Sequence, residues 1–126
     1  MEIRIDPLPD ERRKTPPTDP AELGFGKVFT NRILKADWDA RLGWHDARIE
    51  PYGPLALDPA AKVYHYAQEV FEGLKAYRWQ DGRVVLFRPQ MNAVRFNRSA
   101  IRLALPQVPE DLFLEGIAAL VRLEED

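Results

Sequence analysis

Apolar residues at helical spacing predict two helices in the last third of the chain. The first is predicted over residues 89–105, where one face carries Ala93, Phe96, Ala100 and Leu103. Pro89 suits its first position, because the N–H that a proline lacks would find no partner there. The second helix is predicted over residues 109–123, with an apolar stripe made of Phe113, Ile117, Leu120 and Val121.

The segments before these helices predict strands. Residues 26–38 mix β-branched and apolar residues with polar ones, and a shorter strand is predicted over 46–54, after Gly43. Residues 74–79 and 84–88 flank Gln80-Asp81-Gly82-Arg83 and predict a hairpin with a type I′ turn, because Asp-Gly supplies positive φ angles. Strands followed by helices predict an α+β fold, with an antiparallel sheet covered on one side by helices.

The two ends of the chain differ from its middle. Residues 1–24 hold five of the eleven prolines together with alternating charges, and this composition is typical of a mobile arm. We therefore divide the chain into an arm over 1–24 and one domain over 25–126. Glu124, Glu125 and Asp126 place three carboxylates at the negative end of the last helix dipole, against the usual preference. Such a helix end indicates the N-terminal part of a longer protein.

Composition excludes several classes of function. The chain has 18 basic and 20 acidic residues, so neither nucleic acid nor an anionic membrane is an expected partner. It has no cysteine, which excludes disulfides, thiolate catalysis and cysteine zinc sites. No apolar run has the length of a membrane span, and the N-terminus lacks the apolar core of a secretory signal. A cytoplasmic protein is expected.

Arginines follow one face of the first predicted helix. Arg88, Arg95 and Arg102 recur every seven residues, and Arg98 lies one turn from Arg95. One interpretation is a clamp for phosphate or carboxylate, since the guanidinium group matches those oxygens with two parallel hydrogen bonds. The other is a solvated basic face, and spacing alone favours it. If one arginine does bind an anion, the pattern does not indicate which.

Aromatic residues form the second candidate feature. Most of the aromatic side chains between residues 64 and 79 are expected to pack in the core. Tyr66 and Phe71 differ, because they flank the stretch before Gly73, where a backbone bend would leave them lining a cleft. By themselves, these residues and the arginines predict an aromatic, arginine-rich anion site.

Two other chemistries receive little support. Lys75 is the only lysine of the 64–98 block and a formal candidate for a Schiff-base nucleophile, but a single lysine on a strand is usually solvated. His65 and Glu69 have the i, i+4 spacing of a helical metal pair. A third ligand at recognisable spacing is missing from the sequence, so no metal site is expected.

Three stretches of the chain carry a more specific signal: FGKVFTNRILKADWD (25–39), GWHDARIEPYGPLALDPAAKVYHYAQEVFEGLKAYRWQDG (43–82) and LFRPQMNAVRFNRSAIRLALP (86–106). They resemble the N-terminal small domain of the branched-chain amino acid aminotransferases, which are pyridoxal 5′-phosphate enzymes of fold type IV. The most specific piece is HYAQEVFEGLKAYR. The resemblance implies transfer of the amino group of leucine, isoleucine or valine to 2-oxoglutarate, in an enzyme that is typically a homodimer.

The resemblance also implies roles for particular residues. Arg95, in NAVR, would bind the cofactor phosphate, and Arg88, in FRP, would be structural. Phe25, Tyr66 and Phe71 would line the pocket for the substrate side chain. The Schiff-base lysine of the family lies in a second domain that this chain lacks, so no catalytic residue is expected here and the chain alone is expected to be inactive.

Two further interpretations stay open. Another fold type IV enzyme, such as a D-amino acid aminotransferase or an aminodeoxychorismate lyase, would share the arginine but usually lacks HYxxxxFEGLKAY. A truncated, non-catalytic interaction module would expose the apolar surface on which the second domain should pack.

Overall fold

A three-stranded sheet organises the computed structural model, which describes residues 1–125 and leaves Asp126 outside the described part. Its strand order is β1–β3–β2. β2 (Arg32–Asp39) and β3 (Gly43–Pro51) pair antiparallel, while β1 (Arg4–Ile5) lies parallel to β3 on its other side. The sheet is therefore mixed: the predicted antiparallel pairing holds for β2 and β3, and β1 adds a parallel strand from the segment that was predicted as an arm.

The β2–β3 hairpin is closed by its turn at one end and by a backbone hydrogen bond at the other. One carboxylate oxygen of Asp39 accepts the backbone N–H groups of Arg41 and Leu42, both at 2.8 Å, and Gly43 has a φ of 68°. At the other end Pro51 faces Arg32, and the N–H of Tyr52 donates to the carbonyl of Asn31 at 2.8 Å. β2 begins six residues later than the predicted strand, and β3 begins three residues earlier.

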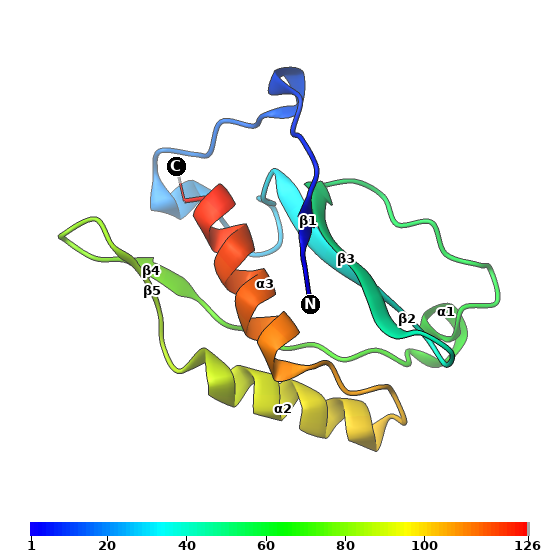
Figure 1. Ribbon diagram of the computed structural model, residues 1–126. Helices are drawn as coiled ribbons and strands as arrows, with labels where there is room; N and C mark the ends of the chain where they lie inside the picture. Colours follow the sequence, from blue (N-terminus) through cyan, green and yellow to red (C-terminus); the bar gives the residue numbers. More distant parts are fainter. Residues whose placement is uncertain (126) are drawn as a thin grey trace.

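Both predicted helices form close to their expected positions, and one of them covers the sheet. α2 (Pro89–Arg102) has Pro89 at its first position, and α3 (Glu110–Leu123) begins after Pro109. In Figure 1, α3 runs between the three-stranded sheet and the β4–β5 hairpin, with α2 below it. α3 approaches β2 closely at Gly116, where a β-carbon would lie 2.5 Å from a methyl group of Leu34.

The most buried side chains come from the central strand and the two helices. They are Ala47, Ile49, Ala93, Ala100 and Leu112.

Differences from the predicted helix faces have local causes. Phe96 and Phe113 join the two helices with ring centroids 5.7 Å apart. The buried positions of α3 are Leu112 and Gly116, so the stripe predicted from Phe113 is only half-buried. Leu103 is exposed because α2 ends before it.

The predicted hairpin forms a two-stranded sheet of its own, separate from the three-stranded sheet. β4 (Ala76–Arg78) pairs antiparallel with β5 (Val84–Leu86). The N–H of Gly82 donates to the carbonyl of Trp79, and the N–H of Trp79 donates to the carbonyl of Arg83. Only Gly82 of the loop has a positive φ, of 84°. The loop therefore has three residues with glycine in the left-handed position, and the predicted type I′ turn is wrong.

The N-terminal segment contacts the domain at several points. It contains β1 and two short 3-10 helices, η1 (Asp10–Arg12) and η2 (Pro20–Glu22). Arg12 donates to the carbonyl of Tyr52 at 2.8 Å, and the N–H of Lys14 donates to the side chain of Asn31 at 2.8 Å. That the N-terminal segment is a mobile arm, and that the domain begins after residue 24, stay predictions.

The carboxylate of Glu124 has a partner despite its place at the end of α3. One oxygen lies 3.2 Å from Arg32 Nη1 and the other accepts the N–H of Asn31 at 2.8 Å. Both charged side chains are only 9% exposed. This pair fastens the end of α3 to the start of β2. Within residues 1–125, the structure has no helix of sufficient length and apolar character to cross a membrane.

Candidate functional site

Arg95 and Glu72 form the most developed polar cluster on α2. Arg95 Nε donates to Glu72 Oε2 at 2.7 Å, and Arg95 Nη2 donates to Glu72 Oε1. The carboxylate thus takes two parallel bonds from one edge of the guanidinium group, which is a strong, directional arrangement. Glu72 comes from the irregular segment between α1 (Lys62–Tyr66) and β4, so the pair links this segment to the helix.

The two partners differ sharply in exposure. The Glu72 side chain is 5% exposed, whereas that of Arg95 is 65% exposed. The hydrogen bonds from Arg95, followed by those from Asn92, lower the pKa of Glu72 below its usual range although burial opposes this. The hydrogen bond to Glu72 raises the pKa of Arg95. Glu72 is therefore an anion at neutral pH, and Arg95 presents a cation to the surface.

Asn92 braces the pair from one turn earlier on α2. Its side-chain nitrogen donates to Glu72 Oε1 at 2.8 Å and to the carbonyl of Gly73 at 3.1 Å. Asn92 and Arg95 are three residues apart and so share a face of the helix. The N-x-x-R spacing carried this signal in the sequence, but nothing in the sequence linked it to Glu72. Glu72 and Asn92 are the two site residues that the sequence analysis missed.

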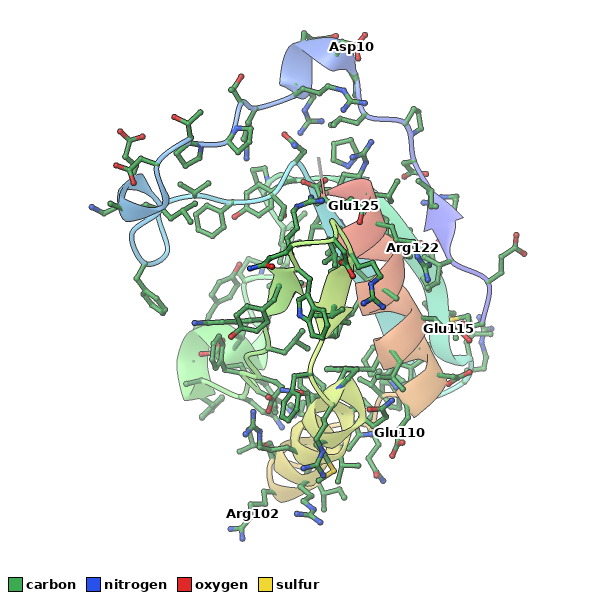
Figure 2. All side chains as sticks on the ribbon, turned by 90° about the vertical axis from the view of Figure 1, so that its left-hand side faces the viewer. Asp10, Arg102, Glu110, Glu115, Arg122 and Glu125 are labelled. Atoms are coloured by element: carbon green, nitrogen blue, oxygen red, sulfur yellow. The ribbon has the colours of Figure 1, made fainter. Side chains whose placement is uncertain are left out.

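The other arginines of the helix are differently placed. Arg88, Arg98 and Arg102 are exposed, and within residues 1–125 none of them forms an ion pair. Arg102 lies seven residues, or about 10 Å, beyond Arg95 along the helix, and it lines a depression with Tyr66. Figure 2 shows Arg102 projecting from the lower end of α2. These three fit the solvated basic face, and Arg95 alone is fixed by an acidic partner.

The predicted pocket residues all lie on the surface. Phe25 is 97% exposed, Tyr66 79% and Phe71 87%. Phe71 directly precedes Glu72, whereas Tyr66 lies in a shallow depression that Arg102 also lines. In Figure 1 the light-blue loop that carries Phe25 and the helix α1 that ends in Tyr66 are on opposite sides of the molecule. The structure therefore does not bring these three together, and their shared pocket stays a prediction.

The remaining candidates have ordinary environments. Lys75 is exposed just before β4. His65 Nε2 lies 2.7 Å from the carbonyl oxygen of Pro59, and His45 Nε2 lies 2.9 Å from Asp39. These contacts account for both histidines within the fold.

No protein-family model matches the chain. Curated relatives do. The chain is 54% identical over 108 residues to branched-chain-amino-acid transaminase 1 of Bacillus subtilis strain 168, covering 86% of this chain and 30% of that protein. It is 53% identical over 118 residues to a probable branched-chain-amino-acid aminotransferase of Staphylococcus aureus strain N315, covering 92% and 33%. For the Mycobacterium tuberculosis H37Rv enzyme of the same name, the identity is 47% over 121 residues, covering 96% and 32%.

The chain is homologous to one part of the branched-chain aminotransferases. This similarity and the α+β architecture confirm the resemblance and the fold class expected from the sequence motifs. The chain spans about a third of the length of the curated relatives it matches, at 30 to 33%. The fold described above is thus one part of the architecture of these aminotransferases.

Proposed function

We propose that this chain forms the part of a branched-chain aminotransferase that binds the phosphate of pyridoxal 5′-phosphate and lines the substrate side-chain pocket. The reaction proposed for the whole enzyme transfers the amino group of leucine, isoleucine or valine to 2-oxoglutarate. One observation carries the proposal: Arg95 is the single arginine of α2 whose guanidinium is exposed and yet held in place, by buried Glu72.

The residues present fit a phosphate group. Arginine matches phosphate with two parallel N–H···O bonds, and Arg95 keeps donors that Glu72 does not use. The Arg95 side chain is 65% exposed, so a ligand can reach it. When bound, pyridoxal 5′-phosphate acts as an electron sink for the amino-acid substrate. Arg95 would hold that group at its phosphate end and so fix how its ring faces the substrate.

The exposed aromatic residues suit the second role. Phe25, Tyr66 and Phe71 offer large apolar surfaces that are open to a substrate or to another part of the enzyme. Branched aliphatic side chains are selected mainly by apolar contact, which rejects near-isosteres only weakly. Covering these rings would also exclude water from the reacting atoms.

The isolated chain is expected to be inactive. The family's catalytic lysine matches no position of this chain. Lys75 lies in FEGLK and does not correspond to that lysine. Amino transfer needs a base that moves a proton from the amino-acid Cα, and a lysine supplies it in this family. Assembly as a homodimer belongs to the same proposal, because it follows from the family. A cytoplasmic location belongs to it as well and rests on the composition of the sequence.

A chimera tests the proposal. This chain would replace the matching third of Bacillus subtilis branched-chain-amino-acid transaminase 1, with which it shares 54% identity over 108 residues. We expect the chimera to transaminate leucine, isoleucine and valine with 2-oxoglutarate and to leave D-alanine unchanged. A folded, cofactor-loaded chimera that acts on D-alanine instead would favour a D-amino acid aminotransferase. One that is inactive on all these substrates would contradict the proposal.

A further inference from the structure

We propose that Glu72 is a positioning residue that aims the unused edge of the Arg95 guanidinium at a phosphate monoester. This inference rests on the proposed function of Arg95. It adds a residue to which neither composition nor spacing assigned a role.

The donor inventory of Arg95 supports this role. An arginine side chain has five N–H donors, in one plane. Glu72 takes the Nε–H and one of the Nη2 hydrogens, which leaves both Nη1 hydrogens and the second Nη2 hydrogen. The end of the guanidinium fork therefore stays available for two phosphate oxygens, while its side edge is occupied.

Burial shows which partner fixes the other. Glu72 is nearly inaccessible, and its carboxylate is also bound by Asn92, whereas Arg95 is mostly exposed. An exposed arginine would otherwise sample many rotamers, and ordering it on binding costs entropy. Because the buried carboxylate holds it already, the guanidinium is preorganised for the ligand. Asn92 also binds the carbonyl of Gly73, so the same cluster fixes the backbone that follows Phe71.

The charge of Glu72 determines in which direction phosphate binding should change when Glu72 is neutralised. Glu72 is anionic and lies beside the proposed phosphate site, so its charge alone repels a phosphate. If Glu72 had only this effect, neutralising it would strengthen phosphate binding. If Glu72 positions Arg95, neutralising it weakens binding in spite of the removed repulsion. The Glu72→Gln variant therefore separates the two roles.

The experiment uses the 126-residue chain with pyridoxine 5′-phosphate and pyridoxine as probes, which lack the aldehyde that reacts with lysines. The ratio of the two dissociation constants, measured by NMR titration at neutral pH, reports the contribution of the phosphate. We expect wild type and the control Arg102→Gln to prefer the phosphate ester equally, and Arg95→Gln to lose the preference. Glu72→Gln should lower the preference for the phosphate ester about tenfold. Removing a residue that orients a metal ligand lowers the affinity for the metal by at least about that factor.

A second readout follows the arginine itself. The Arg95 Nε–H signal should be protected from solvent exchange in wild type and should lose protection in Glu72→Gln, while the backbone amide spectrum shows that the fold remains. If Glu72→Gln does not fold, Asn92→Ala replaces it, with an expected loss of about two- to threefold for a weakened brace.

The possible results distinguish this inference from the function on which it rests. An unchanged or stronger phosphate preference in Glu72→Gln, or in Asn92→Ala if that variant is used, overturns the positioning role and leaves the assignment of Arg95 intact. Equal binding of both probes by wild type and Arg95→Gln overturns the phosphate assignment, and the positioning role with it.

Discussion

Two alanines of the chain have a left-handed backbone, and replacing them with glycine should stabilise the fold. The same Ala→Gly substitution inside a helix should destabilise it. Ala67 has a φ of 48° and Ala104 a φ of 53°, directly after α1 and just after α2. At Ala104 the N–H of Leu105 donates to Ala100 and that of Ala104 to Ile101, the pattern of a Schellman motif, which usually has glycine at this place. Both alanine side chains are exposed, so glycine removes no buried surface.

The magnitude follows from two opposing terms. A left-handed backbone costs an L-residue about 1–2 kcal/mol, and glycine is free of this cost. Glycine also stabilises the unfolded chain by about 0.4–1 kcal/mol through its greater freedom. Ala67→Gly and Ala104→Gly should therefore each raise the free energy of unfolding by about 0.5–1 kcal/mol. The matched control, Ala118→Gly inside α3, should lower it by about 1 kcal/mol.

Urea denaturation followed by circular dichroism measures all three variants against wild type. Opposite shifts of the midpoint, upward for residues 67 and 104 and downward for residue 118, are expected. If all three variants lose similar stability, the backbone is not left-handed after α1 and α2. The path of the segment that begins at Ala67 and carries Phe71 and Glu72 would then be wrong.

Three further predictions test other parts of the fold by urea denaturation. Gly116→Ala should destabilise the protein, because the overpacking cost of about 1–3 kcal/mol exceeds the gain of about 1 kcal/mol in helix propensity. In a double-mutant cycle, Leu34→Ala should remove most of the overpacking cost. Additive effects of the two substitutions would contradict the contact between Gly116 and Leu34. The hydrogen bond to Asp39 raises the pKa of His45, so its stabilisation is present below the ordinary histidine pKa and lost as pH rises through the raised value. His45→Gln should abolish this loss at pH values above the ordinary histidine pKa, and the same decline in the variant would argue against it. The side-chain amide of Asn97 donates to the carbonyl of Val108 and accepts the N–H of the same residue, both at 2.8 Å. Asn97→Ala should therefore cost about 1–3 kcal/mol, and a change below about 0.5 kcal/mol would show that water replaces the amide.

The helices were predictable because their signals are local. Pro89 and the period of Ala93, Phe96 and Ala100 lie within one stretch and specify α2 without reference to the rest of the chain. The end of α2 was placed too late, at residue 105, because the left-handed turn there uses alanine and not the usual glycine. The sequence therefore carried no stop signal before Pro106.

The sheet was less predictable, because its pairing joins distant residues. β1 pairs with residues 48 and 49, more than 40 positions away, and a proline-rich segment gave no signal for a strand. Asp81-Gly82 predicted a tight hairpin correctly, but Asp-Gly serves both a two-residue turn and a three-residue loop. The choice depends on the pairing of Trp79 with Arg83, which no local pattern reveals.

The site divides in the same way. Arg95 was identified through its motif, while periodicity alone could not separate it from Arg88 and Arg102. Glu72 was missed because its contact with Arg95 spans 23 residues of sequence. Burial of a single carboxylate depends on the packing of a segment that has neither helix nor strand, and that packing is not written in any short pattern.

Cofactor retention by two arginine variants of the chimeric enzyme tests the phosphate assignment most directly. Arg95→Ala and Arg88→Ala remove the same charge from positions seven residues apart, but only Arg95 is held by Glu72. After desalting, bound pyridoxal 5′-phosphate is measured by absorbance and compared with the unmodified chimera. We predict that Arg95→Ala loses most of its cofactor and that Arg88→Ala retains it. Equal loss from both variants would contradict the assignment of Arg95 as the phosphate anchor.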